Sequence, residues 1–301
     1  MYDVIIIGAD PAGMTAAIYA KRAGKSVLVL EGASYGGQII NTPSVDNYPV
    51  APHVNGFDFA TKIYEQAKEL GAEFIFEKVV LIKTEGDIKT VVTNTHEYRA
   101  KAVIIATGSE NRKLGVEREN ELVGRGVSYC ATCDGAFYRK KTVAVVGGGN
   151  TALEDALYLS DIAETVYLIH RREGFRAEDS TVKKLKEKQN VKFILNAKVT
   201  RLIAEKRLSA IEITYNDGKK EELTLNGLFV AVGRIPENQN FASVIDLDDS
   251  GYAIAGENCK TKTAGIFVAG DCRVKDVRQL VTATSDGAIA ATNAVKYINE
   301  L

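Results

Sequence analysis

The hydrophobic pattern at the start of the chain alternates between short apolar runs and a longer periodic stretch. Residues 3–7 form an apolar run that ends at Gly8, residues 11–23 have helical spacing, and residues 26–30 are again apolar. Short continuous apolar runs are typical of buried strands, and longer periodic segments are typical of helices. The pattern therefore predicts a strand, a glycine turn, a helix and a second strand.

The segments from residue 56 to residue 106 have the apolar spacing of one helix followed by several short strands. Residues 56–70 place apolar side chains on one helical face, and Gly71 follows as a helix stop. Alternating strands are expected up to about residue 99, followed by a buried strand at 102–106. The polar run 111–120 is interpreted as a linker because it has neither the strand nor the helix period.

The pattern of strand, glycine turn and helix restarts in the middle of the chain. An apolar run at 142–146 leads into Gly147-Gly148-Gly149, and a helix at 150–160 and a strand at 165–169 are expected to follow. The leading glycines of the two repeats, Gly8 and Gly147, are 139 residues apart. A further helix and a set of alternating strands are expected at 178–188 and 191–232.

The C-terminal part returns to the pattern of the start. A polar stretch at 236–240 is interpreted as a second crossing, and it is followed by a strand at 265–269, by Gly270-Asp271 and by a helix of small residues at about 278–299. The predicted fold is α/β, with two Rossmann-like dinucleotide-binding domains, the second inserted into the first. The expected domain ranges are 1–113 with 242–301, and 114–241.

The first glycine turn has most features of a dinucleotide site. The segment from Gly8 to Gly13, which includes Pro11 and Ala12, stands between a strand and a helix, where backbone amides can hold a pyrophosphate. Glu31 ends the second strand, 23 residues after Gly8, where it can bind ribose hydroxyls and repel a 2′-phosphate. A strand-to-helix turn that binds no ligand is the alternative.

Asp10 departs from the GxGxxG pattern, which has glycine at this position. A carboxylate there could crowd the pyrophosphate and add like charge beside it. Comparing ligand retention before and after Asp10→Gly tests whether the departure weakens binding.

The second glycine turn is paired with the opposite charge. Gly147 to Ala152, which includes Gly149, Asn150 and Thr151, has the GxGxxA form. The next strand ends in His170-Arg171-Arg172, and Arg176 follows. Because guanidinium groups can grip a phosphate through two hydrogen bonds, this turn is predicted to bind NADPH and the first a nucleotide with a free 2′-hydroxyl. A solvated helix start is the alternative for the arginines.

Cys130-Ala131-Thr132-Cys133 lies between the two turns and is followed at once by Asp134. Cysteines at this spacing can form a reversible disulfide, and an acid beside them can move protons. The alternatives are an inert crosslink or packed free pair, a turn or cap role for Asp134, and a zinc site. A zinc site needs about four ligands, and the remaining cysteines and histidines are scattered, at Cys259, Cys272, His53, His96 and His170.

Composition narrows the setting in which this chemistry takes place. The 301 residues include 38 basic and 39 acidic side chains, a formal net charge of −1, which gives no overall attraction to nucleic acid or anionic lipid. No apolar run approaches the ~20 residues of a membrane span, and the start lacks the basic region of a signal peptide. We therefore expect a cytoplasmic, reducing location, no membrane association and no nucleic-acid partner.

These motifs together resemble those of the low-molecular-weight, bacterial-type thioredoxin reductases, a class of pyridine nucleotide-disulfide oxidoreductases, over essentially the whole chain. The matching segments are Gly8–Gly13, Gly36–Gln38, Cys130–Asp134, Gly147–Ala152, His170–Ala177, Gly265–Asp271 and Arg278-Gln279. The resemblance implies FAD in the split domain and NADPH in the inserted domain. It also implies a homodimer that reduces thioredoxin or a thioredoxin-like redoxin. No metal is expected, because the remaining cysteines and histidines form no second ligand pair.

The resemblance further implies which residues contact the cofactors. Those expected at FAD are Gly8, Pro11, Ala12, Gly13, Glu31, Gly37, Gln38, Asn47, Ala106, Gly270, Asp271, Arg278 and Gln279. Those expected at NADPH are Gly147, Gly149, Asn150, Thr151, His170, Arg171, Arg172 and Arg176. An ordinary helix N-terminus is the alternative for Arg278 and Gln279.

By the same resemblance, electrons pass from NADPH to FAD, to the Cys130–Cys133 disulfide and then to a redoxin. Cys133 would face the flavin, Cys130 would attack the redoxin disulfide, and Asp134 would donate the proton, with a pKa raised by the adjacent thiolates. The disulfide and the nicotinamide would take turns at the flavin, because one domain carries both. The crossings near 111–120 and 234–241 would serve as hinges.

Other functions are considered beside this one. A peroxide-forming oxidase or peroxiredoxin-reductase component usually has an extra N-terminal redoxin domain, whereas this chain begins at the first strand. A relative with another electron donor conflicts with the intact Gly147–Ala152 turn and Arg171-Arg172. A flavin or nucleotide sensor without enzymatic activity does not account for the CxxC-Asp motif. A related flavoprotein that reduces another redoxin stays open.

Overall fold

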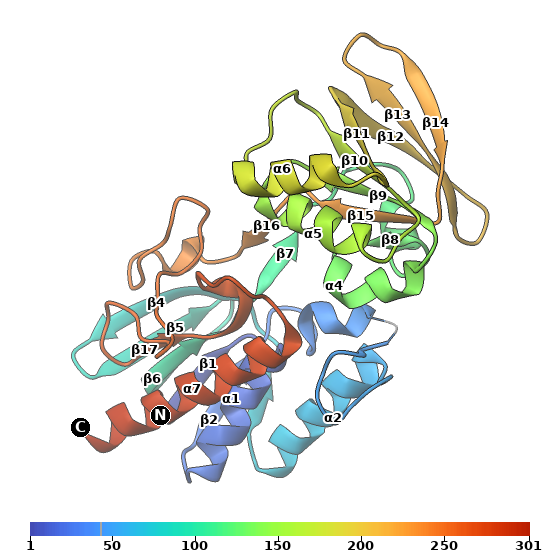
Figure 1. The fold of residues 1–301 in the computed structure, drawn as a ribbon. Coiled ribbons are helices and arrows are strands. Elements are labelled where there is room, and N and C mark those ends of the chain that lie inside the picture. Colours follow the sequence, from blue (N-terminus) through green and yellow to red (C-terminus); the bar gives the residue numbers. More distant parts are fainter. Residues whose placement is uncertain (43) are drawn as a thin grey trace. The chain divides into compact units, whose positions relative to one another are not determined.

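The computed structural model describes residues 1–42 and 44–301. The chain divides into two compact units, Met1–Glu110 with Ile235–Leu301 (the first unit) and Asn111–Arg234 (the second unit). Both chain termini therefore belong to the first unit (Figure 1). In the described part of the chain, no helix has the length and apolar character needed to cross a membrane.

Within the described residues, the first unit is built on a seven-stranded sheet in the order β3-β2-β1-β6-β5-β4, with β17 also paired to β6. The parallel strands β1, β2 and β17 are almost continuous apolar runs, as expected for strands buried on both faces. The strands are β1 (Tyr2–Ile7), β2 (Val27–Leu30), β3 (Glu73–Ile75), β4 (Val79–Glu85), β5 (Ile88–Thr93), β6 (Glu97–Ile105) and β17 (Ile266–Val268).

The long strand β6 joins the two ends of the chain in one sheet. Its first half, from Glu97 to Ala100, pairs with β5 antiparallel, whereas its second half, from Val103 to Ile105, pairs with β17 in parallel. The strand expected at 102–106 is therefore only the end of a longer strand. The change of partner along β6 explains why its sequence changes from mixed to continuously apolar.

Helices α1 and α7 pack against each other on the sheet of the first unit (Figure 1). Gly287 permits this approach, because a Cβ at that position would collide with the Ala12 carbonyl. Helix α7 begins at Leu280, two residues later than expected, with Gln279 as its N-cap. The helices of the first unit are α1 (Pro11–Arg22), α2 (Gly56–Glu69) and α7 (Leu280–Asn299).

The second unit, all of whose residues are described, combines a five-stranded parallel sheet in the order β11-β10-β9-β15-β8 with a three-stranded antiparallel sheet, β12-β13-β14. Its strands are β8 (Val127–Ser128), β9 (Thr142–Gly147), β10 (Thr165–His170), β11 (Val191–Leu195), β12 (Ala197–Ala204), β13 (Leu208–Tyr215), β14 (Lys220–Thr224) and β15 (Gly227–Ala231). Its helices are α3 (Glu119–Leu122), α4 (Ala131–Asp134), α5 (Asn150–Ser160) and α6 (Asp179–Glu187).

The segment 111–120, expected to be a linker, is largely folded into the second unit. Glu119 is buried and accepts hydrogen bonds from the backbone amides of Leu114 and Gly115 at 2.9 Å and from the Tyr129 hydroxyl at 2.7 Å. The segment is polar and yet folded, because the carboxylate of Glu119 pairs with backbone amides of the same segment. The chain crosses between units at two short paired strands, β7 (Ser109–Asn111) and β16 (Arg234–Pro236).

Candidate active site and nucleotide sites

Two glycines close the turn between β1 and α1. Gly8 has a φ of +108°, and a Cβ there would collide with the carbonyl of Ala106 at the end of β6. A Cβ on Gly13 would in turn collide with the Gly8 carbonyl. The predicted glycines are therefore required by the close contact of strand, turn and helix.

Asp10 is the N-cap of α1 in an extended conformation (φ −83°, ψ 177°), and its Oδ1 accepts a hydrogen bond from the Gly13 amide at 2.9 Å. This backbone conformation requires no glycine, and aspartate is a preferred N-cap residue. The partly buried carboxyl has its pKa raised to about 7, first by desolvation and then by the charges of Asp271 and Glu31. Asp10 therefore fits the turn sterically but places an acid at the helix N-terminus.

Glu31 is held beside the same turn by the backbone. Its Oε2 accepts a hydrogen bond from the Ala9 amide at 2.8 Å, and its Oε1 accepts one from the Ala33 amide at 2.9 Å. The carboxylate thus stands at the carboxyl end of β2, where the sequence predicts a contact with ribose.

Candidate residues from distant segments meet at this turn. The Gly36 amide donates to the Ala9 carbonyl at 2.7 Å, and a Cβ on Gly37 would lie 2.9 Å from the Asp10 Cβ, so Gly37 and Gln38 lie beside the turn. A Cβ on Gly270 would lie 2.9 Å from the Ala12 Cβ, which brings the Gly270-Asp271 loop to the same helix start.

Asn47 and Gln279 are also brought together, across 232 positions of sequence. The Asn47 side-chain amide donates to Gln279 Oε1 at 3.0 Å. Arg278, the neighbour of Gln279, stacks over the Tyr252 ring at 4.2 Å and donates to the Arg273 carbonyl at 3.3 Å. The motif Arg278-Gln279 is therefore more than a bare helix start, because both side chains have specific contacts.

Unsatisfied polar atoms in the first unit fit the binding of a polar ligand. Thr107 Oγ1 and Arg278 Nε are buried and have no hydrogen-bond partner in the part of the chain that the structure describes. The Thr107 Cα lies next to the space above Gly8, directly after β6. Buried polar groups are normally paired, so these two atoms are suited to a bound nucleotide. The sequence did not single out Thr107; its position directly after a buried strand was the available signal.

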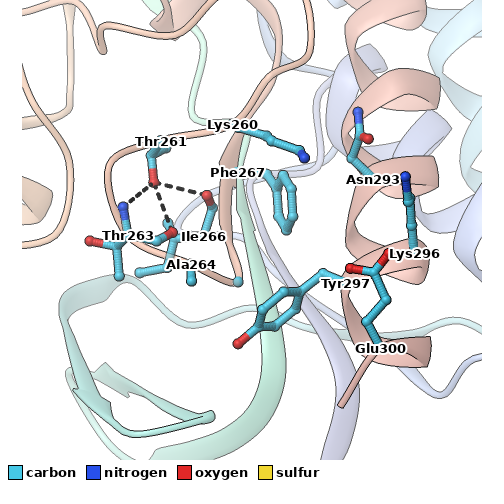
Figure 2. Close-up of a pocket in the computed structure, with 11 residues that line it drawn as sticks. Lys260, Thr261, Thr263, Ala264, Ile266, Phe267, Asn293, Lys296, Tyr297 and Glu300 are labelled. Atoms are coloured by element: carbon cyan, nitrogen blue, oxygen red, sulfur yellow. Dashed lines mark hydrogen bonds between the residues drawn. The ribbon is translucent and has the colours of Figure 1, made fainter.

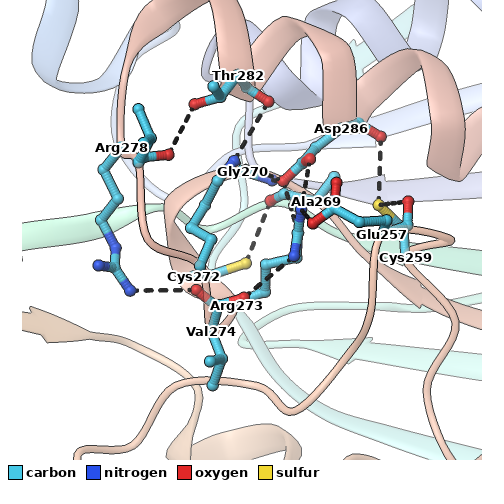
Figure 3. Close-up of polar contacts among 12 residues, drawn as sticks. Glu257, Cys259, Ala269, Gly270, Cys272, Arg273, Val274, Arg278, Thr282 and Asp286 are labelled. Carbon is cyan, nitrogen blue, oxygen red and sulfur yellow. Dashed lines mark hydrogen bonds and ion pairs between the residues drawn. The ribbon is translucent and has the colours of Figure 1, made fainter.

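Asp286, in the middle of α7, organises the loop that carries Asp271 (Figure 3). Its carboxylate accepts hydrogen bonds from the Gly270 amide at 3.0 Å, from Arg273 at 2.7 Å and from Lys275 at 2.9 Å. Desolvation opposes ionisation, but these hydrogen bonds outweigh it and lower the pKa of Asp286. Asp286 was not predicted, although it is the one acidic residue in the predicted helix 278–299.

The turn between β9 and α5 has glycine in the place of Asp10. Gly149 is the N-cap of α5 with φ −102° and ψ 179°, and no side chain caps the helix. A Cβ on Gly149 would meet only the Arg176 carbonyl, at 3.8 Å. A Cβ on Gly147 would lie 2.5 Å from that of Ala152, which explains the GxGxxA form.

The arginine segment folds back against this second turn. The Arg176 amide donates to the Gly148 carbonyl at 2.7 Å, and the Glu178 amide donates to Asn150 Oδ1 at 3.0 Å. Arg171, Arg172 and Arg176 are exposed, and none of them forms an ion pair with another described residue. Three cations beside an open helix N-terminus are suited to a phosphate.

His170 is buried at the base of this segment. Its ring stacks on Phe175 with centroids 5.3 Å apart, and it fills the space where a Cβ on Gly148 would lie. Burial lowers the pKa of His170, and the three neighbouring arginines lower it further, so the ring is neutral at pH 7. Its Nε2 has no hydrogen-bond partner among the residues described. Thr151, which follows Asn150, is exposed in the first turn of α5.

Cys130 and Cys133 form a disulfide, with their Cα atoms 5.3 Å apart. The bond closes over the short helix α4, and the Cys133 amide donates to Cys130 Sγ at 3.2 Å. Ala131 is buried and Thr132 exposed, and both cysteines are half-buried. The pair is thus bonded rather than packed as free thiols, and solvent reaches it.

Asp134 lies at the end of α4, next to the disulfide. The Ser128 hydroxyl donates to Asp134 Oδ2 at 2.6 Å, and the Asp134 amide donates to the Cys130 carbonyl at 3.1 Å. Ser128 is buried in β8 and was not predicted, since no pattern distinguishes it from other strand residues. Asp134 is therefore a positioned acid and not only a turn residue.

The other two cysteines are structural. Cys259 and Cys272 are free and buried, and desolvation raises the pKa of each thiol to about 12. Such thiols are poor nucleophiles, which fits a packing role for both residues.

A cavity of about 180 Å³ lies between the β17 region and the C-terminal part of α7 (Figure 2). Phe267 and Tyr297 stand on its two sides, and the Thr261 hydroxyl donates to the Ile266 carbonyl at 2.8 Å in its wall. None of the candidate cofactor or redox residues lines it, so it is separate from the nucleotide turns.

Comparison with known proteins agrees with this arrangement. The family model described as pyridine nucleotide-disulphide oxidoreductase matches residues 2–287. The chain is similar to the thioredoxin reductase of Listeria innocua, with 43% identity over 303 residues that cover 100% of this chain and 95% of the relative.

Solved structures give the same picture. The thioredoxin reductase of Streptococcus pyogenes has a TM-score of 0.96 at 40% identity and covers 100% of this chain and 99% of its own. That of Lactococcus lactis, in its FR conformation, has a TM-score of 0.69 at 37% identity, with both chains covered completely. The two-domain α/β fold with Rossmann-like units predicted from the sequence is confirmed.

Proposed function

The chain belongs to the pyridine nucleotide-disulphide oxidoreductase family, and we propose that it is an NADPH-dependent thioredoxin-disulfide reductase whose redox-active disulfide is Cys130–Cys133. The observation that carries the proposal is this bonded, solvent-reached pair with a positioned acid beside it. Nothing in the structure favours another redoxin or another electron donor.

Thioredoxin reductases of this family use FAD and NADPH. When bound, FAD would supply the two-electron redox chemistry that links NADPH to the disulfide. In this chain, FAD would be held by the β1–α1 turn and by the side chains of Glu31, Asn47, Asp271 and Gln279. The turn at Gly149 with the three unpaired arginines would hold NADPH, since the arginines supply the charge that a 2′-phosphate requires.

The two sulfurs differ in their hydrogen bonds, and this supports different roles. The Cys133 amide donates to Cys130 Sγ at 3.2 Å, and the Thr132 hydroxyl lies 3.4 Å from the same sulfur. After reduction, such donors stabilise a thiolate on Cys130. Cys130 is therefore the sulfur that attacks the thioredoxin disulfide, forming a mixed disulfide that Cys133 then resolves by releasing reduced thioredoxin.

Asp134 is the acid that moves the proton in this exchange. The Ser128 hydroxyl fixes its Oδ2, and its amide is bonded to the Cys130 carbonyl, so the carboxyl is held in place in the turn that directly follows Cys133. In its protonated form it protonates the thiolate that leaves when the disulfide opens.

A movement of the second unit completes the proposed cycle. The disulfide and the candidate NADPH residues belong to this one unit, whereas the candidate FAD residues belong to the other. Because the segment around Glu119 is folded, we expect the hinge residues to lie in the two crossings at β7 and β16 rather than along all of 111–120. A crosslink that fixes the units should allow at most one reductive event, whereas unchanged multiple turnover would contradict the hinge.

The assembly and the location are proposed from the family resemblance. A homodimer is expected, and light scattering coupled to size-exclusion chromatography tests it directly. A cytoplasmic location follows from the reducing chemistry proposed for the dithiol.

The experiment that tests the function follows NADPH oxidation in the presence of oxidised thioredoxin. Wild type should reduce thioredoxin catalytically, whereas Cys130→Ser and Cys133→Ser should abolish this activity. Cys272→Ser serves as the matched control, because its thiol is buried within the first unit whereas the dithiol belongs to the second, and it should keep the activity. Thioredoxin reduction that survives in Cys133→Ser would contradict the proposal.

A further inference from the structure

Asp10 is the feature of the proposed FAD site that the family pattern does not explain. It occupies the N-cap position of α1, whose equivalent in the second turn is Gly149. In a GxGxxG turn, glycine at this position lets the pyrophosphate approach the backbone closely. Asp10 places a carboxyl at this position. If the carboxyl is ionised, its negative charge repels the pyrophosphate of FAD.

The groups around Asp10 are acidic or neutral. Glu31 from the end of β2 and Asp271 from the loop after β17 add negative charge, and the Cys272 thiol beside Asp271 is neutral. Gly37 and Gly108 face the carboxyl from two further segments and carry no charge. No lysine or arginine of the described residues forms an ion pair with Asp10, and the nearby cations Arg273 and Lys275 are engaged by Asp286.

The two carboxyl oxygens of Asp10 have different surroundings. Oδ1 accepts the hydrogen bond from the Gly13 amide, whereas a Cβ on Gly108 would lie 3.3 Å from Oδ2 and one on Gly270 would lie 3.8 Å from it. The Ala12 amide also favours the ionised carboxyl, but less than burial disfavours it. Because the cap is made by Oδ1, a proton on Oδ2 leaves the helix cap in place.

We propose that FAD binding to this protein takes up one proton, which is held on Asp10 Oδ2 and donated as a hydrogen bond to an oxygen of the FAD pyrophosphate. The balance is simple: the apoprotein with ionised Asp10, one FAD and one proton give the holoprotein with neutral Asp10. The like charge is thereby replaced by a donor, while Oδ1 still caps α1. This inference rests on the FAD site proposed above.

The pH range follows from the raised pKa of Asp10, which is about 7 without ligand. Below pH 7 the carboxyl already carries the proton, so FAD affinity is constant. Above pH 7 binding must add the proton, and the apparent Kd for FAD rises roughly tenfold per pH unit.

The test measures FAD release from the full-length holoprotein between pH 6 and pH 9. The protein is diluted serially at each pH, and free FAD is followed by its fluorescence. Wild type should show a constant Kd up to about pH 7 and then the tenfold rise per unit. Asp10→Asn keeps an N-cap acceptor, as the natural Asn55 cap of α2 shows by accepting from the Phe57 amide at 2.8 Å. This variant and Asp10→Gly should have a Kd independent of pH over the range in which wild type changes.

Titration calorimetry in buffers of different ionisation enthalpy gives a second readout. At pH 8, wild type should take up close to one proton per FAD, and Asp10→Asn should take up none. A flat wild-type profile, or the same slope in Asp10→Asn, would overturn the inference and leave the FAD site intact. Failure of all three proteins to bind FAD would overturn the site itself.

Discussion

The turn before α1 and the turn before α5 hold their N-cap residues, Asp10 and Gly149, in nearly the same extended conformation. What surrounds the two positions differs. Asp10 has the acids Glu31 and Asp271 near it, whereas a Cβ on Gly149 would meet only the Arg176 carbonyl, beside the unpaired arginines that follow β10. One backbone design therefore supports two opposite electrostatic environments.

On the function proposed above, this difference teaches that the fold would provide the phosphate-binding turn, while a few charged side chains would select the nucleotide. The Glu31 carboxylate would repel a 2′-phosphate, and the guanidinium groups after β10 would attract one. The same contrast predicts that exchanging single charges between the turns changes affinity and pH dependence without changing the fold.

The largest effect is expected from removing the arginines of the second turn. Arg171→Ala combined with Arg172→Ala should lower kcat/KM for NADPH roughly 100-fold and leave that for NADH nearly unchanged, because charge-assisted hydrogen bonds to the 2′-phosphate are lost. Steady-state kinetics with both nucleotides measure this. Arg201→Ala, an exposed arginine of the same unit that pairs with Glu212, is the control. An unchanged NADPH preference would contradict the assignment of the two turns.

The second-largest effect is expected when Gly149, in the turn before α5, is replaced by aspartate, the residue at the equivalent position 10 of the turn before α1. Gly149→Asp should weaken NADPH binding roughly tenfold, and more at high pH, because it sets a carboxylate against the phosphates. Gly149→Ala should bind nearly normally, since a Cβ there meets only the Arg176 carbonyl at 3.8 Å. Equal affinities of the two variants for NADPH would show that charge at this position does not matter.

A smaller effect is expected from Glu31→Gln in the first turn. The glutamine keeps one acceptor oxygen but loses the charge, so FAD affinity should fall by about threefold to tenfold. The same change should reduce discrimination against nucleotides that carry a 2′-phosphate. Fluorescence measurement of FAD release tests the first expectation, and an increase of FAD affinity in the variant would refute it.

The smallest effect concerns the stability of the protein stripped of FAD. The pKa of Asp10 is raised from 3.8 to about 7 in the folded chain. Its contribution to folding is therefore fully favourable below pH 3.8 and is lost as the pH rises to 7. Asp10→Asn should raise the Tm of the apoprotein by a few degrees at pH 8 and have little effect near pH 4. A gap in Tm that stays constant across this range would contradict the raised pKa.

Much of the fold could be predicted because its strands are buried on both faces. The apolar runs of β1, β9 and β10 and the glycine turns after β1 and β9 leave few other arrangements. The change of partner along β6 could not be predicted, since it depends on β17, which is distant in sequence. The folded segment around Glu119 was not predicted because its hydrogen bonds to a carboxylate follow neither the helix nor the strand period.

The candidate site was predictable where its chemistry has a fixed spacing. The dithiol, its acid and the two charge patterns are visible in the sequence. Ser128 and Asp286 are recognised only by their contacts in the structure, and Thr107 only by its burial. Ser128 reaches Asp134 only because β8 lies beside α4 in space, and Asp286 reaches Gly270 only because α7 packs over that loop. The hydrophobic and polar pattern of the sequence does not predict these two hydrogen bonds.

The most direct test of the proposed function is an anaerobic titration of the FAD-loaded protein with NADPH, followed at the flavin absorption band. Wild type should be reduced in two stages, with the disulfide taking the electrons of the first equivalent and the flavin bleaching fully only with further NADPH. Cys133→Ser should lose the first stage and bleach at once. Bleaching of wild type in a single stage, identical to that of Cys133→Ser, would contradict electron transfer from NADPH to the Cys130–Cys133 disulfide.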